Sequence, residues 1–148
     1  MGRAVRKRPL TPYPFPSSAA VSAAMRANRK RDTAPELKLR SLLHRRGLRF
    51  RVNHELLVPG LRVRPDVVFA RHRLAVFVDG CFWHSCPWHG TRPRVNTHYW
   101  LPKLRRVKAR DRKVRTLLTR GGWTVLRFWE HTSPERAADL VRKALVVR

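Results

Sequence analysis

Apolar residues recur with two different periods along the chain, and the changes of period predict where helices and strands lie. Leucines keep roughly helical spacing from the N-cap signal at Asp32-Thr33 to Gly47, which predicts a helix over residues 35–46. Residues 48–52 alternate between apolar and basic side chains, which is the pattern of a strand. A Pro-Gly pair at 59–60 then predicts a turn.

Two short apolar runs, residues 65–69 and 74–78, are separated by a polar stretch that is short enough for a tight turn. The pattern predicts a β-hairpin in which positions whose numbers add up to about 144 face each other. This register places Asp66 near Val78 and beside Asp79. We therefore expect two carboxylates together at one end of the hairpin.

The second half of the chain predicts a helix, a strand and a last helix. Helical spacing holds over residues 99–120, and the alternating run 123–129 follows the glycine pair that closes this helix. Ser133-Pro134 is an N-cap signal with proline at the first helical position, so the last helix begins there. The order helix, three strands, helix, strand, helix predicts a layered α/β or α+β domain, and α/β is the class that we expect.

The charge of the chain indicates a polyanionic partner. Lys and Arg number 34 against 9 Asp and Glu, which gives a net charge of +25. Such a chain repels itself unless a polyanion neutralises it, so nucleic acid is the expected partner and an anionic membrane surface is the rival. No apolar run reaches the length of a spanning helix and no secretory signal is visible, so we expect a cytoplasmic protein.

The N-terminal segment differs in composition from the rest of the chain. Residues 1–20 are basic and rich in Pro and Ser, which predicts a disordered arm. Residues 21–148 form the predicted folded domain, with a short helix expected over residues 22–29.

Both cysteines of the chain lie in one loop, where Cys81, Cys86 and His89 have the spacing C-x4-C-x2-H. Thiolates and imidazoles in a tight loop suit tetrahedral zinc. His131, just past the strand 123–129, is the favoured fourth ligand, and His98 or His84 are the alternatives. A Cys81–Cys86 disulfide competes with this reading, but the flanking histidines favour a metal.

The same region carries candidates for hydrolytic chemistry. Asp66 and Asp79 supply oxygen ligands of the kind that Mg²⁺ prefers, although each alone is also explained by a turn or a cap. His84 titrates near neutral pH, which suits a general base that activates water. Phe82, Trp83 and Trp100 are candidates for stacking on DNA bases, whereas Trp123, Phe128 and Trp129 are expected in the core.

These motifs together resemble the very short patch repair (Vsr) DNA mismatch endonucleases. The run Gly80-Cys81-Phe82-Trp83-His84 is the most specific part, and the resemblance extends in order from about residue 22 to residue 131. It implies a restriction-endonuclease-like fold, with a central mixed β-sheet flanked by helices and a structural zinc site. It also implies Mg²⁺-dependent nicking of one strand of duplex DNA, 5′ to the T of a T·G mismatch that arises when 5-methylcytosine deaminates.

The resemblance assigns roles residue by residue. Asp66 and the backbone carbonyl of Val78 would bind Mg²⁺, His84 would activate water, and Glu36 would stand near the waters of the metal. Zinc would be bound at the positions Cys81, Cys86, His89 and His131. The expected DNA-contacting residues are Met25, Phe82, Trp83, Trp100 and Lys103.

Two positions depart from the family pattern. Asp79, a further catalytic candidate, stands where the best-known members carry a histidine, so it either binds metal or organises water. Val107 stands where an asparagine would help to read the mismatch. A nuclease of this fold with another DNA target, or a non-catalytic zinc-containing DNA-binding module, is therefore kept as an alternative.

The resemblance also sets expectations about the setting of the protein. We expect a monomer that acts on double-stranded DNA near the bacterial nucleoid. Mismatch-repair proteins or a cytosine methyltransferase are the expected partners, and no membrane contact is expected.

Overall fold

The computed structural model describes residues 32–90 and 93–147, and its elements follow the predicted order except between residues 48 and 63. The predicted arm, the short helix over residues 22–29 and Met25 lie outside the described residues. The elements are α2 (Ala34–Arg45), β1 (Leu56–Val58), β2 (Leu61–Val63), β3 (Val67–Phe69), β4 (Leu74–Asp79), α3 (Thr97–Arg120), β5 (Thr124–Trp129) and α4 (Pro134–Val146).

A mixed sheet in the order β3-β4-β5 forms the centre of the fold, with β3 antiparallel and β5 parallel to β4. The predicted hairpin is present, and its register pairs Val67 with Val76, one position from the expected pairing. The backbone N–H of Asp66 donates to the carbonyl of Val76 at 3.0 Å. The prediction that Asp66 lies near Val78 is therefore confirmed.

The predicted strand over residues 48–52 is wrong. Only Arg51 pairs with the sheet, through an isolated bridge to Val68. β3 is three residues long, so it offers too short an edge for a five-residue partner. The extra strands are instead β1 and β2, a separate antiparallel hairpin whose turn contains Gly60 at φ +75°.

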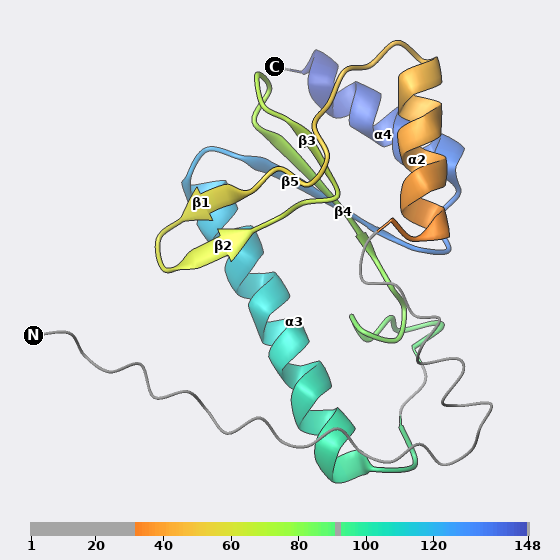
Figure 1. Cartoon of the computed structure of the whole chain (residues 1–148), viewed down its shortest axis with the longest axis vertical. Coiled ribbons are helices and arrows are strands. Elements are labelled where there is room, and N and C mark those ends of the chain that lie inside the picture. The colour runs from red at the N-terminus through yellow and green to blue at the C-terminus, as the bar shows by residue number, and fades with distance from the viewer. Residues whose placement is uncertain (1–31, 91–92, 148) are drawn as a thin grey trace, which may run out of the picture.

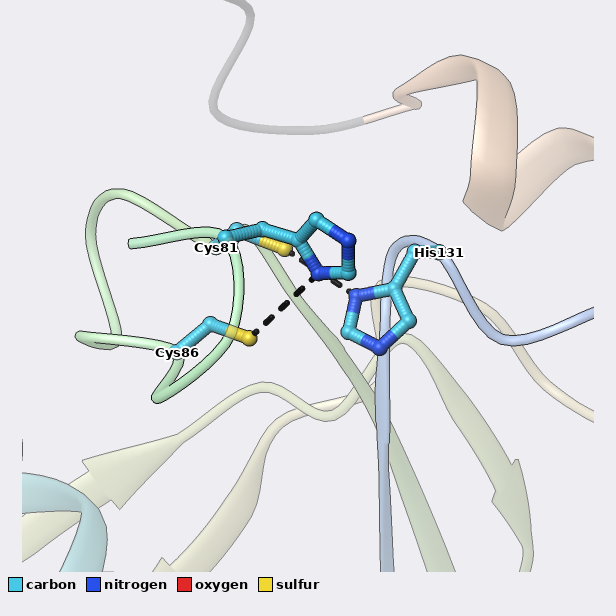
Figure 2. A group of neighbouring side chains, drawn as sticks. Cys81, Cys86 and His131 are labelled. Atoms are coloured by element: carbon cyan, nitrogen blue, oxygen red, sulfur yellow. Dashed lines mark hydrogen bonds between the residues drawn. The ribbon is translucent and has the colours of Figure 1, made fainter. Parts of the chain in front are cut away.

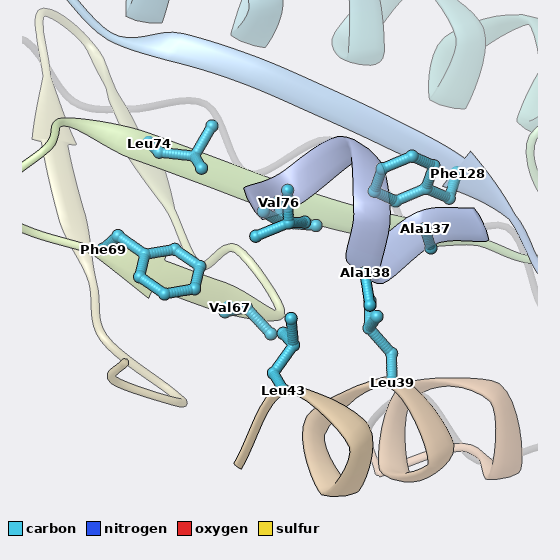
Figure 3. Packing of buried hydrophobic residues seen from close by; sticks show 10 residues of the cluster. Leu39, Leu43, Val67, Phe69, Leu74, Val76, Phe128, Ala137 and Ala138 are labelled. Carbon is cyan, nitrogen blue, oxygen red and sulfur yellow. The ribbon is translucent and has the colours of Figure 1, made fainter. Parts of the chain in front are cut away.

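Helices cover both faces of the sheet, as Figure 1 shows. On one face, Leu39 and Leu43 of α2 and Ala138 of α4 pack against Val67 and Val76 (Figure 3). On the other face, a second cluster joins the sheet and the β1–β2 hairpin to α3; it contains Val68, Ala75, Phe77, Val114 and Leu118. Each fully buried Leu or Val contributes roughly 1.5–3 kcal/mol. The predicted α/β arrangement with a mixed sheet flanked by helices is thus confirmed.

The helix ends explain how the first and last helices are held. The Ser133 hydroxyl accepts a bond from the N–H of Arg136 at the start of α4, as predicted. At the start of α2, Thr33 makes no side-chain cap, and Oε2 of Glu36 accepts the N–H of Asp32 at 3.0 Å instead.

Of the three aromatics expected in the core, only Phe128 is buried, while Trp123 and Trp129 are half-buried. Within residues 32–90 and 93–147, every helix is too short or too polar to cross a bilayer.

Candidate active site

The Asp66 carboxylate lies at the end of β4 and is fixed there by the backbone. Its Oδ2 accepts the N–H of Val78 at 2.6 Å. The carbonyl of Asp79 accepts a bond from Glu130 on the β5 side. Because successive carbonyls of a strand point in opposite directions, the Val78 carbonyl is directed to the other side, toward Asp66. A carboxylate and a carbonyl oxygen therefore converge on one place.

The surroundings of Asp66 suit a divalent cation. Burial, followed by the negative charges of Glu36 and Asp79, raises the pKa of Asp66 to about 7. Among the described residues, none forms a salt bridge with this carboxylate. Mg²⁺ takes one or two carboxylates and keeps several waters, so Asp66 with the Val78 carbonyl fits it.

Glu36 approaches this place from the first turn of α2. Its side chain is 4% exposed, and it raises the pKa of Asp66 through its charge. Arg40, one turn further along α2, contacts Glu36 and also donates to the backbone carbonyl of Asp66. The helix and the strand that supply the two acids are thus joined by one arginine.

Asp79 ends β4, and the register of the hairpin places it beside Asp66. Its carboxylate is bound by Arg127, whereas Arg40 contacts Glu36 and the backbone of Asp66. Arg127 of β5 donates to both of its carboxylate oxygens, at 2.8 and 3.0 Å. The guanidinium also lies 4.3 Å above the Phe77 ring, and its Nη1 is buried and has no hydrogen-bond partner in the part of the chain that the structure describes. Two oxygens committed to one guanidinium favour an organising role for Asp79 over direct metal binding.

His84 is held by an acid that lies far away in sequence. Its Nδ1 is 2.5 Å from Oδ2 of Asp111 on α3, and its Nε2 is 3.8 Å from Asp79. Burial opposes the charged imidazole, but the hydrogen bond to Asp111 and the charges of Asp79 and Asp111 outweigh it. The pKa of His84 is therefore raised above its ordinary 6.5.

Arg40, Asp111 and Arg127 have no role in the site predicted from the sequence. Each could have been noticed in the sequence, because each is a charged residue at a position where the periodicity predicts an apolar one. Asp111 lies on the face of α3 that also carries Leu104, Val114 and Leu118, the buried residues of that helix. Arg40 similarly lies between the buried residues of α2.

Aromatic side chains form a cluster where the loop after β4 meets the start of α3. Phe82, Trp83 and Trp100 pack edge to face, with ring centroids 5.3–5.8 Å apart. The ammonium of Lys103 lies 5.2 Å from the Trp83 centroid and 5.6 Å from that of Trp100. All four side chains are half-buried, so the cluster keeps surface that bases can contact.

Cys81, Cys86, His89 and His131 come together as a group that can hold a metal ion. Figure 2 shows the cysteines of the loop pointing toward His131, which follows β5. One ligand atom from each residue lies within 4.8 Å of all the others. The N–H of Gly90 donates to the carbonyl of Cys86 at 2.8 Å and closes the loop. Only glycine fits at this position, because a Cβ would meet the same carbonyl at 2.4 Å.

The spacing within this group suits a tetrahedral site. The Sγ of Cys81 lies 3.3 Å from Nδ1 of His131, and that of Cys86 lies 3.9 Å from Nδ1 of His89. Sulfur and nitrogen ligands of tetrahedral zinc stand about 3.6 Å apart. Both cysteines are free thiols, so the competing disulfide is absent from the described residues. His98 and His84, the alternative ligands, lie outside the group.

Comparison with known proteins identifies relatives across most of the chain. The family model described as DNA mismatch endonuclease Vsr matches residues 17–90. The type II nicking enzyme V.NaeI of Lentzea aerocolonigenes is 50% identical over 130 residues, covering 87% of this chain and 78% of that protein. V.XorIIP of Xanthomonas oryzae, also a type II nicking enzyme, is 42% identical over 110 residues, covering 72% and 76%.

The DNA mismatch endonuclease Vsr of Escherichia coli is 42% identical over 113 residues, covering 76% of this chain and 70% of that protein. These matches confirm the predicted resemblance and the predicted class of enzyme, a strand-nicking DNA endonuclease. The chain belongs to the DNA mismatch endonuclease Vsr family.

Proposed function

We propose that the chain is a Mg²⁺-dependent endonuclease that nicks one strand of duplex DNA 5′ to the T of a T·G mismatch. The observation that carries the proposal is the contact of His84 with Asp111 at the end of β4, in the same centre as Asp66. The family description, DNA mismatch endonuclease, supports a mismatch as the target. A restriction-endonuclease-like core is part of this proposal, since a mixed sheet between helices is compatible with it.

The residues of the centre have distinct tasks in this mechanism. Asp66 and the Val78 carbonyl would hold Mg²⁺, which when bound polarises a phosphodiester and makes water more acidic. Asp111 accepts the Nδ1–H of His84, and this leaves Nε2 as the atom that takes a proton from the attacking water. Asp79 stays on Arg127 and orders the surroundings of that imidazole.

The aromatic cluster and the Cys/His group have supporting tasks. Phe82, Trp83 and Trp100 would wedge into the base stack, because a mismatched pair costs less to unstack, while Lys103 faces the displaced bases. Met25 is proposed to contact the DNA from the other groove. Zinc on the Cys/His group would brace the loop that carries His84, and four protein ligands leave no position for a reactive water.

The test is a nicking assay on end-labelled duplexes that carry T·G, T·A or C·G at one position. Each strand is labelled separately, with Mg²⁺ or with EDTA. We expect one cut in the T strand of the T·G duplex, only with Mg²⁺. Asp66→Asn should abolish the cut while duplex binding persists. The control is Asp139→Asn, the same change at an acid whose side chain is 70% exposed, and this variant should still nick.

The other outcomes assign the alternatives. Equal nicking of the matched duplexes would mean a nuclease with another DNA target. Binding without nicking under every condition would mean a zinc-containing DNA-binding module. One nicked strand needs one centre, so we also expect a monomer of 17.4 kDa by light scattering.

A further inference from the structure

Arg40 is a nearly buried arginine, and two of its three nitrogens donate to residues of the candidate active site. Its side chain is 11% exposed. Nε and Nη2 donate to the backbone carbonyl of Asp66 at 3.3 and 3.1 Å, and Nη1 donates to Asp32 at 2.6 Å. Nη2 also lies 3.5 Å from Oε2 of Glu36. One guanidinium fork thus joins the start of α2 to the residue before β3.

Packing alone does not explain this arginine. Position 40 lies between Leu39 and Leu43, which are 2% and 0% exposed and face the sheet. Such a position of an amphipathic helix is usually apolar, and taking a guanidinium out of water costs free energy unless its donors are used. Here the donors meet the backbone carbonyl of Asp66 and the carboxylates of Glu36 and Asp32, so the arginine determines how the start of α2 is placed against Asp66.

We infer that Arg40 is a positioning residue for strand cleavage: it fixes the Glu36 carboxylate against the peptide unit that carries Asp66, and it acts on the rate through Glu36. This inference rests on the proposed function. Oε2 of Glu36 is held on two sides, by the N–H of Asp32 and by Arg40. Without the guanidinium, this carboxylate, which is 4% exposed, loses its cation and its fixed position relative to Asp66.

Two substitutions separate the geometry of Arg40 from its charge. Arg40→Lys keeps the charge but lacks the planar fork that reaches three acceptors, and Arg40→Met keeps neither. We expect both variants to lower the single-turnover nicking rate at saturating Mg²⁺ by about 10- to 100-fold, the usual cost of losing an outer partner of a metal site. A wild-type rate in Arg40→Lys would overturn the inference, because charge alone would then suffice.

Metal binding gives a readout that is independent of activity. Mn²⁺ is titrated into the protein bound to an already nicked duplex, and free Mn²⁺ is followed by its electron paramagnetic resonance signal. Arg40→Met should bind Mn²⁺ at least as tightly as the wild type, because a neighbouring cation has been removed. A rate that recovers fully at high Mg²⁺ would overturn the inference, since Arg40 would then act only on metal affinity.

A double variant tests the route through Glu36. If Arg40 acts through this carboxylate, Arg40→Met should change the rate less than threefold when Glu36→Gln is already present. Equal losses in both backgrounds would overturn the inference. Arg45→Met, the same change at an exposed site of α2, is the control and should keep the wild-type rate.

The controls also separate this inference from the proposed function. Asp66→Asn should lose both Mn²⁺ binding and nicking; if it still nicks, the proposed function fails, whatever Arg40 does. Thermal melting checks the fold of each variant. If Arg40→Met does not fold, Arg40→Lys carries the rate test and its cycle with Glu36→Gln.

Discussion

Nδ1 of His84 lies 2.5 Å from Oδ2 of Asp111, although 27 positions separate them in the chain. Asp111 also accepts a bond from Arg127 at 3.1 Å, so its carboxylate is fixed from two sides. This arrangement holds the imidazole with its proton on Nδ1 and directs Nε2 toward the site. The acid on α3 therefore determines which nitrogen of His84 can act as a base.

Asp111→Asn should lower the single-turnover nicking rate by about 10²- to 10⁴-fold, the range typical of a general base that loses its orienting acid. An amide nitrogen facing Nδ1 would favour the wrong tautomer of His84. Binding to the duplex should change little, because the Asp111 side chain is 22% exposed and its hydrogen bonds within the described residues go to His84 and Arg127. Measured rates within threefold of the wild type would show that Asp111 serves only the fold.

The raised pKa of His84 predicts where the rate falls at low pH. Only the neutral imidazole accepts a proton, so the rate should rise with pH through a midpoint above 6.5. The profile is measured at saturating Mg²⁺, because the proton on Asp66, whose pKa is raised to about 7, competes with the metal. Asp79→Asn removes a negative charge that raises the pKa of His84, so its midpoint should move to lower pH. A midpoint that stays in place would mean that another group controls the rate.

Asp79 and Arg127 form a nearly buried ion pair, with side chains 9% and 13% exposed. Removal of one partner leaves the other charge uncompensated, so Asp79→Asn and Arg127→Met should each lower the free energy of unfolding by about 3 kcal/mol. The double variant should lose clearly less than the sum, since neither charge of this pair is left without the other. Urea denaturation of the four proteins gives the coupling. Additive losses would contradict the pairing.

The parts of this centre that the sequence predicts are those set by local pattern. The hairpin between β3 and β4 brings Asp66 to Val78, because a short turn fixes the register of both strands. The C-x4-C-x2-H loop likewise brings its own ligands together, and His131 joins them because β5 runs parallel to β4. These expectations depend on neighbours in sequence or on adjacent strands.

The parts that sequence reasoning misses depend on packing between distant elements. Asp111 reaches His84 only because α3 crosses the sheet face that also presents Asp79 and Arg127. Periodicity marks such residues as charges on an apolar face but does not identify their partners. The strand expected over residues 48–52 fails for a related reason, since a partner edge of sufficient length is a property of the sheet.

The Cys/His group should stabilise the protein and take no part in bond breaking, so its removal should destabilise the fold. Cys81→Ser should lower the bound zinc, measured by atomic absorption, and the Tm by about 10 °C or more, because metal binding contributes to folding. The control is His98→Asn, a histidine outside the group, which should keep its zinc. Replacement of zinc by Cd²⁺ should leave the nicking rate within a few-fold. A nicking rate that depends strongly on which metal this group holds would mean that this metal takes part in strand cleavage.

The outer face of α3 should contribute to DNA binding through phosphate contacts. The helix carries nine basic residues, and its one acid, Asp111, is turned toward Arg127. Lys108, Arg112 and Arg115 are exposed and follow one stripe, at spacings of four and three residues. Each phosphate contact contributes about 0.9 to the slope of log K against log salt concentration. Replacing these three residues by Gln should therefore reduce the slope by about 2–3.

The control for α3 removes the same charge from α4, on the opposite face of the sheet. Arg136, Arg142 and Lys143 are also exposed, and their replacement by Gln changes the net charge equally. A general attraction between a protein of charge +25 and DNA would weaken equally in both triple variants. Local contacts would lower the slope only in the α3 variant. Equal slopes, measured by fluorescence anisotropy on one duplex, would show that the α3 face is merely solvated.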